Sequence, residues 1–235
     1  MIRITIGAAS DPGKKRKENQ DFHAFRNPEG GSAHNKGILL ALADGMGGHS
    51  GGSVASQTTI NALMETYYND PSGSITDSLE QAFLKANREV IEKGKDDLNL
   101  HGLGSTLTAV VLKDDKMYYG HVGDSRGYII YDHQIKQFTE DHSYVASLLK
   151  AGIINEEEAA THPQGNIITR AIGAEEDLKV DLSQEHLELK TEQYILLCCD
   201  GLYRVVSNEE IKDTVYRHKN PETISTISLP HQLHG

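Results

Sequence analysis

The clearest structural signal in this chain is the stretch at residues 104–131, GSTLTAVVLKDDKMYYGHVGDSRGYIIY. Three apolar runs, at residues 105–112, 117–122 and 127–131, are separated by the short polar turns KDDK and GDS. Runs of this length that are rich in Val, Ile and Tyr are typical of β-strands. Their close spacing predicts antiparallel hairpins, because parallel neighbours need a much longer connection.

Amphipathic helices are predicted on the N-terminal side of this stretch. One helix face is indicated by the i, i+3, i+4, i+7 spacing of Ile60, Leu63, Met64 and Tyr67, and a second apolar stripe runs through residues 75–90. Further strands are predicted at residues 2–6, 38–43, 187–189 and 194–199, and further helices at residues 143–150, 155–160 and 207–216. Strands and paired helices without strict alternation predict an α+β fold, in which antiparallel sheets pack on each other and are covered by helices.

The composition narrows the possible partners. The 235 residues carry a formal net charge of −11, and such an acidic chain repels nucleic-acid phosphates and anionic lipids. No run approaches the roughly 18 apolar residues of a membrane span, and the N-terminus lacks the pattern of a secretory signal. The two cysteines are adjacent, which excludes a long-range disulfide. We therefore expect one domain over residues 1–235, a monomer in the cytoplasm, with neither nucleic acid nor membrane as a partner.

Three aspartates lie where apolar runs end: Asp44 after ILLALA, Asp124 after GHVG and Asp200 after YILLCC. A single Asp-Gly pair is usually only a turn. If the three ends converge, however, the repulsion in an all-oxygen cluster is relieved by protonation or by a divalent cation. Oxygen ligands select Mg²⁺ or Mn²⁺ over Zn²⁺, and two such ions about 3.5–4 Å apart can activate a bridging water for attack on phosphorus.

A basic cluster, KKRK, precedes Asp21 in the segment at residues 11–21. Taken alone, such a run is usually a solvated loop. A guanidinium close to two metal ions, however, would hold phosphate oxygens through paired hydrogen bonds.

Seven motifs in a fixed order resemble the metal-dependent type 2C Ser/Thr protein phosphatases, in their bacterial branch. They are residues 11–21 (DPGKKRKENQD), 43–49 (ADGMGGH), 104–106 (GST), 120–126 (GHVGDSR), 139–143 (TEDHS), 166–173 (NIITRAIG) and 199–202 (CDGL). The resemblance implies a four-layer α/β/β/α sandwich, in which two central antiparallel sheets are flanked by helix pairs. It also implies hydrolysis of phosphoserine and phosphothreonine in proteins by a metal-activated water, in opposition to a Ser/Thr kinase.

The resemblance also implies a role for each matching residue. The cofactors would be two Mn²⁺ or Mg²⁺ ions, with a third, looser one. The expected ligands and contacts are Asp44 bridging two ions, Gly45 through its carbonyl, Asp200 on the first ion, Asp21 near the second, Asp124 on the third and Arg16 on the phosphate. Residues 143–163 would form a flap beside the active site that influences the choice of phosphoprotein substrate.

Two departures from the family pattern bear on activity. Met46 stands where the animal branch has a histidine that is proposed as general acid, so the pattern names no proton donor. The family's terminal Asp-Asn motif, which binds the first metal and leads into a last strand, has no match: Asp213, the only aspartate after Asp200, is followed by Thr on a predicted helix. We therefore expect a ligand and a strand to be missing. The alternative is a catalytically impaired pseudophosphatase that binds phosphoproteins.

Two further motifs suggest other enzymes. Residues 48–52 fit Gly-x-Ser-x-Gly, the nucleophile elbow of serine hydrolases, but the apolar run ends too early to lead into it. Cys198 and Arg204 have the spacing of cysteine-dependent phosphatases. A thiol inside YILLCC is expected to be buried and inert, and Asp200 within that loop would repel phosphate.

Overall fold

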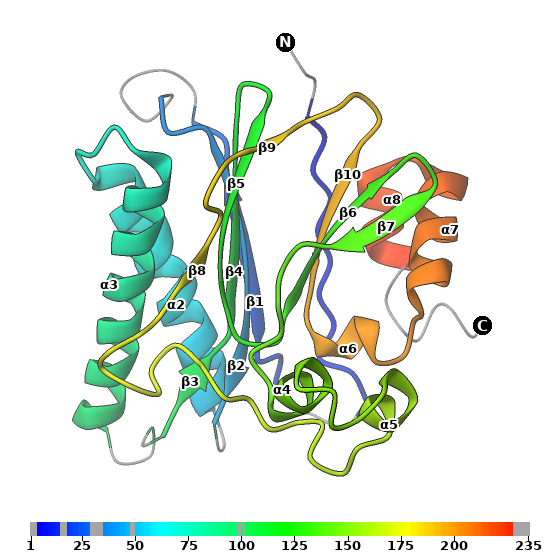
Figure 1. The fold of residues 1–235 in the computed structure, drawn as a ribbon. Coiled ribbons are helices and arrows are strands. Elements are labelled where there is room, and N and C mark those ends of the chain that lie inside the picture. Colours follow the sequence, from blue (N-terminus) through cyan, green and yellow to red (C-terminus); the bar gives the residue numbers. More distant parts are fainter. Residues whose placement is uncertain are drawn as a thin grey trace.

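Two antiparallel β-sheets lie face to face in the computed structural model of this chain, and helices cover their outer faces (Figure 1). The structure describes residues 4–14, 18–28, 35–47, 50–97, 100 and 102–227. The layers follow the order helix pair, sheet, sheet, helix pair. This arrangement confirms the predicted four-layer α+β sandwich.

The first sheet is built around the strand that carries Asp44. It contains, in spatial order, β1 (Asp21–Arg26), β2 (Ile38–Met46), β4 (Leu107–Lys113), β5 (Lys116–Val122) and β8 (Asp181–Leu182), with β3 (Gly104–Ser105) on β2 and β9 (Leu187–Glu188) on β5. Side chains along β2 alternate between buried and partly buried, as the period of two requires. The strand predicted at residues 38–43 is confirmed and continues to Met46, so that Asp44 lies inside a hydrogen-bonded strand.

Helices α2 (Gly51–Asn69) and α3 (Ile75–Asp96) cover the outer face of this sheet (Figure 1). Both were predicted from their apolar spacing, and both are confirmed. Ile60, Leu63 and Tyr67 of α2 are fully buried in one cluster with Phe83 of α3 and with the sheet. Burial of each such side chain contributes roughly 1.5–3 kcal/mol, so the core is concentrated on this side of the molecule.

The second sheet is smaller. It contains β10 (Tyr194–Cys198), β6 (Arg126–Tyr131) and β7 (Gln134–Gln137), with β6 in the middle. Helices α7 (Asn208–His218) and α8 (Pro221–Ile227) pack on it through a cluster that includes Ile130, Ile211, Val215 and Ile224. The predicted capping box starts α7: the Ser207 hydroxyl accepts a hydrogen bond from the Glu210 amide, and the Glu210 carboxylate accepts one from the Ser207 amide.

The connection between β5 and β6 corrects the hairpin prediction. The KDDK turn does join β4 and β5 as an antiparallel hairpin. The GDS turn, by contrast, carries the chain from the first sheet to the second, so β5 and β6 are not paired. Gly123 makes this crossing with φ +112°, and a Cβ at this position would lie 2.6 Å from Cβ of Thr106. The crossing places Asp124 at the junction of the two sheets.

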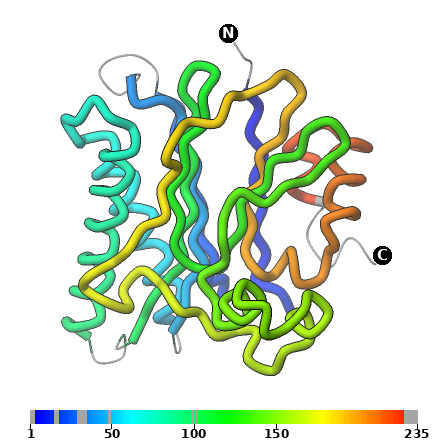
Figure 2. The backbone as a smooth tube through the Cα atoms, in the orientation of Figure 1, coloured from blue at the N-terminus to red at the C-terminus, as the bar shows by residue number. Residues whose placement is uncertain are grey.

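The strand predicted at residues 2–6 is wrong over the part that the structure describes. Residues 4–6 form no ladder, although Ile4 packs against the buried cluster of Val110, Leu112 and Met117. Apolar alternation predicted a partly buried, extended segment, but it says nothing about whether a backbone partner is available. The segment runs along the sandwich (Figure 2) and lines, together with β10, a cavity of about 1130 Å³ that also reaches Asp21, Asp44 and Asp200.

The predicted flap lies at the end of the sandwich near α6 (Asp200–Tyr203) (Figure 1). It contains α4 (Tyr144–Lys150) and α5 (Glu156–Ala160), which confirms the helices predicted there. The side chains of Ser143 and Asn155 accept hydrogen bonds from backbone amides at the two helix starts. Among the described residues, no helix combines the length and apolar character needed to cross a membrane.

Candidate metal centre

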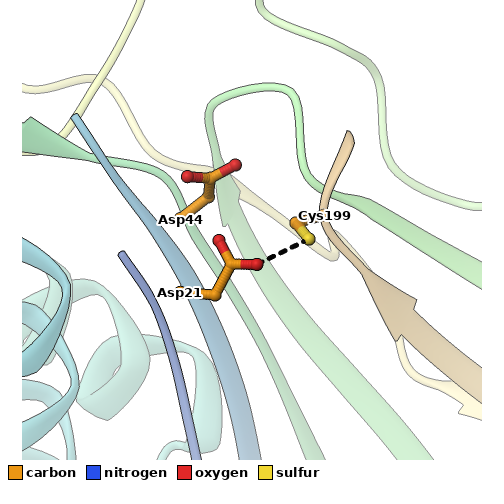
Figure 3. A group of neighbouring side chains, drawn as sticks. All are labelled: Asp21, Asp44 and Cys199. Atoms are coloured by element: carbon orange, nitrogen blue, oxygen red, sulfur yellow. Dashed lines mark hydrogen bonds between the residues drawn. The ribbon is translucent and has the colours of Figure 1, made fainter. Parts of the chain in front are cut away.

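Asp21 and Asp44 are direct partners across two neighbouring strands. The register of β1 and β2 places their Cα atoms opposite each other. Opposite residues of an antiparallel pair project their side chains on the same side, within about 4.5–5.5 Å at Cβ. Figure 3 shows both carboxylates turned toward the same space, which Cys199 borders from the other side. Sheet pairing therefore gathers two of the predicted ligands.

Backbone and hydroxyl contacts hold Asp44 in place. Its amide donates a hydrogen bond to the Thr106 hydroxyl (2.9 Å), and its carbonyl accepts one from the Thr106 amide (2.9 Å). Gly45 follows with its backbone against the start of α2, where a Cβ would lie 1.8 Å from the Gly52 carbonyl oxygen. Only glycine fits at position 45, and the strand end is rigid because of these contacts.

The aspartates repel one another in the absence of a cation. Burial, together with the negative charges of Asp21 and Asp200, raises the pKa of Asp44 to about 8. Burial and the charges of Asp200 and Asp141 raise the pKa of Asp124 to about 6. A shift upward in both groups means that the site favours a bound proton or metal ion over free carboxylates. The structure thus brings together the charges of Asp21, Asp44, Asp124 and Asp200.

Cys199 belongs to this cluster, although the sequence did not single it out as a ligand. Its thiol donates a hydrogen bond to Oδ2 of Asp21 (3.0 Å), and one potential ligand atom from each of Asp21, Asp44 and Cys199 lies within 4.8 Å of the other two. Burial and the neighbouring carboxylates raise the pKa of this thiol. The available signal was its place at the end of a strand, directly before Asp200.

Cys198, the neighbouring cysteine, is not suited to act as a nucleophile. It is buried, as predicted, and burial raises the pKa of its thiol to about 12. A thiol in this state is a poor nucleophile at neutral pH. Arg204, its partner in the cysteine-phosphatase spacing, instead forms ion pairs with Asp200 and Asp124. These contacts exclude the cysteine-phosphatase reading of this segment.

The flap base is tied to the junction that carries Asp124. The Gly123 amide donates a hydrogen bond to Nδ1 of His142 (3.0 Å), and the His142 amide donates one to the Gly123 carbonyl (2.8 Å). Nearby, the Arg126 guanidinium pairs with Asp141 (2.8 Å) and lies 3.8 Å from the ring centre of Tyr203. These side chains connect the junction of the two sheets with the flap base and with α6, which are far apart in the sequence.

Two predicted residues cannot be placed. Arg16 lies outside the described residues, and so does the start of the Gly-x-Ser-x-Gly motif at Gly48. Ser50, the serine of that motif, is the N-cap residue of α2 and follows β2 only after an intervening segment.

Comparison with known proteins settles the family. The family model for protein phosphatase 2C matches residues 14–233. A putative protein phosphatase 2C-type from Streptococcus pyogenes is 39% identical over 236 residues, covering 96% of this chain and 92% of the relative. The chain belongs to the protein phosphatase 2C family.

Solved structures of phosphatases support the same assignment. The serine/threonine phosphatase of S. agalactiae is similar with a TM-score of 0.86 and 33% identity, covering 96% of this chain and 93% of that one. The catalytic domain of the serine/threonine protein phosphatase PstP, solved with two manganese ions, has a TM-score of 0.81 and 32% identity, covering 97% and 90%. The predicted family and fold are therefore confirmed.

The donor set in this 2C phosphatase fits hard divalent ions. Carboxylate oxygens dominate the cluster. Burial and the repulsion between the carboxylates raise the pKa of Asp44, and a bound cation would relieve that repulsion. Mg²⁺ and Mn²⁺ prefer such oxygen ligands, whereas the Cys199 sulfur beside them is a soft donor.

Proposed function

We propose that this chain hydrolyses phosphoserine and phosphothreonine side chains of proteins, with Mn²⁺ or Mg²⁺ bound at its aspartate cluster. The predicted enzyme class, a protein-serine/threonine phosphatase, is confirmed by relatives of that kind that match nearly the whole chain, such as the Listeria monocytogenes phosphatase stp. The alternative, a protein that only binds phosphoproteins, is not favoured by these relatives.

One observation supports the metal site most directly. The pairing of β1 with β2 sets Asp21 opposite Asp44, and the charge of Asp200 acts on the same carboxylate from the start of α6. Three acidic groups from separate segments thus act on one point of the structure. Such an arrangement destabilises the folded protein unless a cation neutralises the acidic groups. Clusters of this kind are therefore found mostly at functional sites.

We assign the roles of the individual residues on this basis. Two bound ions would lower the pKa of a shared water and neutralise the phosphate during an in-line displacement. Asp44 would contact both ions and Asp200 the first, while Asp21 would lie near the second. Gly45 would contribute its carbonyl oxygen. Arg16 would hold the phosphate oxygens, and no side chain would form a covalent intermediate.

The flap at residues 143–163 is proposed to influence which phosphoproteins bind. Its helices α4 and α5 lie beside α6, whose first residue is Asp200 (Figure 1). The exposed surface of the flap includes Tyr144 and Leu149 of α4 and Ile153 in the turn that follows. The expected substrates are proteins that a Ser/Thr kinase has phosphorylated. Apolar side chains of the substrate near its phosphorylated residue would contact this surface.

The test is phosphate release from a phosphothreonine peptide by the purified chain, with Mn²⁺ and with EDTA. Activity should need the metal and should be lost by at least about a thousandfold in Asp44→Asn, on the scale of about 4 kcal/mol of lost transition-state stabilisation. Asp213→Asn is the matched control, because Asp213 is exposed on α7 and away from the cluster. Equal activity with Mn²⁺ and EDTA, or in Asp44→Asn and wild type, would refute the proposal.

A further inference from the structure

The side chain of Arg204 joins three segments beside the aspartate cluster. Its Nε lies 3.0 Å from Oδ2 of Asp200, and its Nη2 lies 3.8 Å from Oδ2 of Asp124. The same guanidinium donates hydrogen bonds to the side chain of Asn166 and to the carbonyl of Gly165 (3.1 Å). Gly165 and Asn166 directly follow the predicted flap at residues 143–163, and we call these two residues the flap segment.

The contact with Asp200 alone does not indicate a special role for Arg204. Arg204 follows the four residues of α6, and an i, i+4 ion pair at a protein surface contributes only about 0.3–0.5 kcal/mol. The contacts to Asp124 and to the flap segment are different, because they join parts of the chain that are separated by about 80 and 40 residues. Local helix geometry does not explain them.

Asp124 needs a positive partner. Its side chain is only 7% exposed, and the Tyr203 hydroxyl also donates a hydrogen bond to it (3.4 Å). Asp200 and Asp141 add negative charge nearby. A buried carboxylate among other acids is stable only when a cation or several donors neutralise it. Arg204 provides a charge that does not titrate at physiological pH and a planar set of donors that can serve several acceptors together.

We propose that Arg204 is the fixed cation of the Asp124–Asp200 pair, that it takes the place of a third divalent ion there, and that it ties this pair to the flap segment at Gly165 and Asn166. The inference rests on the proposed function, because it assumes that divalent ions bind at Asp44 and Asp200. A third ion at Asp124 would have to displace the guanidinium and break its contacts with the flap segment. The chain is therefore expected to hold two ions and to keep its flap anchored without a third.

The experiment compares the wild type with Arg204→Gln, Arg204→Lys and the control Arg88→Gln. Arg88 is exposed on α3, so its replacement removes the same charge far from the site. Bound manganese is counted by equilibrium dialysis against millimolar Mn²⁺ and elemental analysis. Hydrogen exchange is followed in EDTA at the amide of Ile167, which donates a hydrogen bond to the Gln164 carbonyl in the same turn.

Wild type, Arg204→Lys and Arg88→Gln should bind the same number of ions, and Arg204→Gln should bind one more. The Ile167 amide should exchange roughly tenfold faster in Arg204→Gln than in the wild type. An unchanged ion count in Arg204→Gln, an extra ion in Arg204→Lys, or unchanged exchange in Arg204→Gln would each overturn the proposal.

The metal site and the part assigned to Arg204 can be refuted separately. If neither the wild type nor Arg204→Gln binds Mn²⁺, the proposed function is wrong. Hydrogen exchange in EDTA then still decides whether Arg204 anchors the flap segment. If the wild type and Arg204→Gln bind the same number of ions and both hydrolyse the phosphopeptide, the proposed function stands and the role proposed for Arg204 is wrong.

Discussion

Replacement of Asp44 by asparagine should stabilise the metal-free protein while it removes activity. The carboxyl group of Asp44 has its pKa raised from 3.8 to about 8 by burial and by the neighbouring carboxylates. A raised pKa in an acid means that the folded state binds the proton more tightly than the unfolded state does. The stability of the metal-free protein therefore falls as the pH rises from about 4 through 8. Asparagine is neutral at every pH and escapes this loss.

The size of the effect follows from the same values. At about 1.4 kcal/mol for each pKa unit, the folded state at pH 7 loses about 4 kcal/mol relative to the unfolded state, because Asp44 stays protonated in the fold with a pKa of about 8 but ionises in the unfolded chain with a pKa of 3.8. Solvent entry and relaxation of the neighbouring carboxylates reduce this, so about 2 to 4 kcal/mol is expected. For a chain of this length, each kcal/mol raises the melting temperature by about 2–4 °C. Asp44→Asn should thus melt about 5–15 °C higher than the wild type in EDTA at pH 7.

Thermal unfolding in EDTA at pH 7 and at pH 4.5 is the assay. The advantage of Asp44→Asn should shrink to about 1 kcal/mol or less at pH 4.5, because this pH is less than one unit above the unfolded-state pKa of 3.8. Added Mn²⁺ should reverse the order at pH 7, because two ions, each at a hundred times its Kd, would together stabilise the wild type by about 5.4 kcal/mol, and the variant lacks the shared ligand. Asp213→Asn should stay within about 0.5 kcal/mol of the wild type. A variant that melts no higher than the wild type in EDTA at pH 7 would show that the acidic cluster is not strained.

Three further substitutions test other parts of the structure. Cys198→Ser should keep turnover within about threefold, because this buried thiol is not a nucleophile; complete loss of turnover in a folded variant would restore the cysteine mechanism. Gly123→Ala should cost about 2 to 4 kcal/mol in urea unfolding, because φ is +112° and a Cβ meets Thr106, whereas Gly73→Ala has open space and should cost less than about 1 kcal/mol. Ser207→Ala should cost about 1 kcal/mol through loss of the α7 cap without changing KM for a phosphopeptide, and an altered KM would mean that α7 contributes to the site.

Local patterns predicted much of the fold. Features that depend on residues a few positions apart could be predicted from the sequence. They are the helix faces around Ile60 and at residues 75–90, the β4–β5 hairpin and the capping box at Ser207. Apolar spacing determines which face of an element is buried. Turn and cap residues determine where an element starts or stops.

The two wrong predictions concern strand pairing, which depends on a partner strand elsewhere in the chain. The segment at residues 4–6 has the alternation of a strand but no ladder within the described chain, and the GDS turn looks like a hairpin turn but leads to another sheet. Strand pairing is decided by hydrogen bonds to distant segments. A period of two in the sequence is the same whether or not such a partner exists.

The candidate site divides in the same way. The amino-acid sequence alone determined that aspartates stand at the ends of buried runs and, through the order of its motifs, which family the chain resembles. Only the tertiary structure decided that Asp21 faces Asp44 across two strands, that the Cys199 thiol joins them, and that Arg204 reaches both Asp124 and the flap segment. The physical reason is range: helix and strand patterns are fixed by neighbours along the chain, whereas side chains such as Asp21 and Cys199, which are 178 positions apart, meet only after the two sheets have packed.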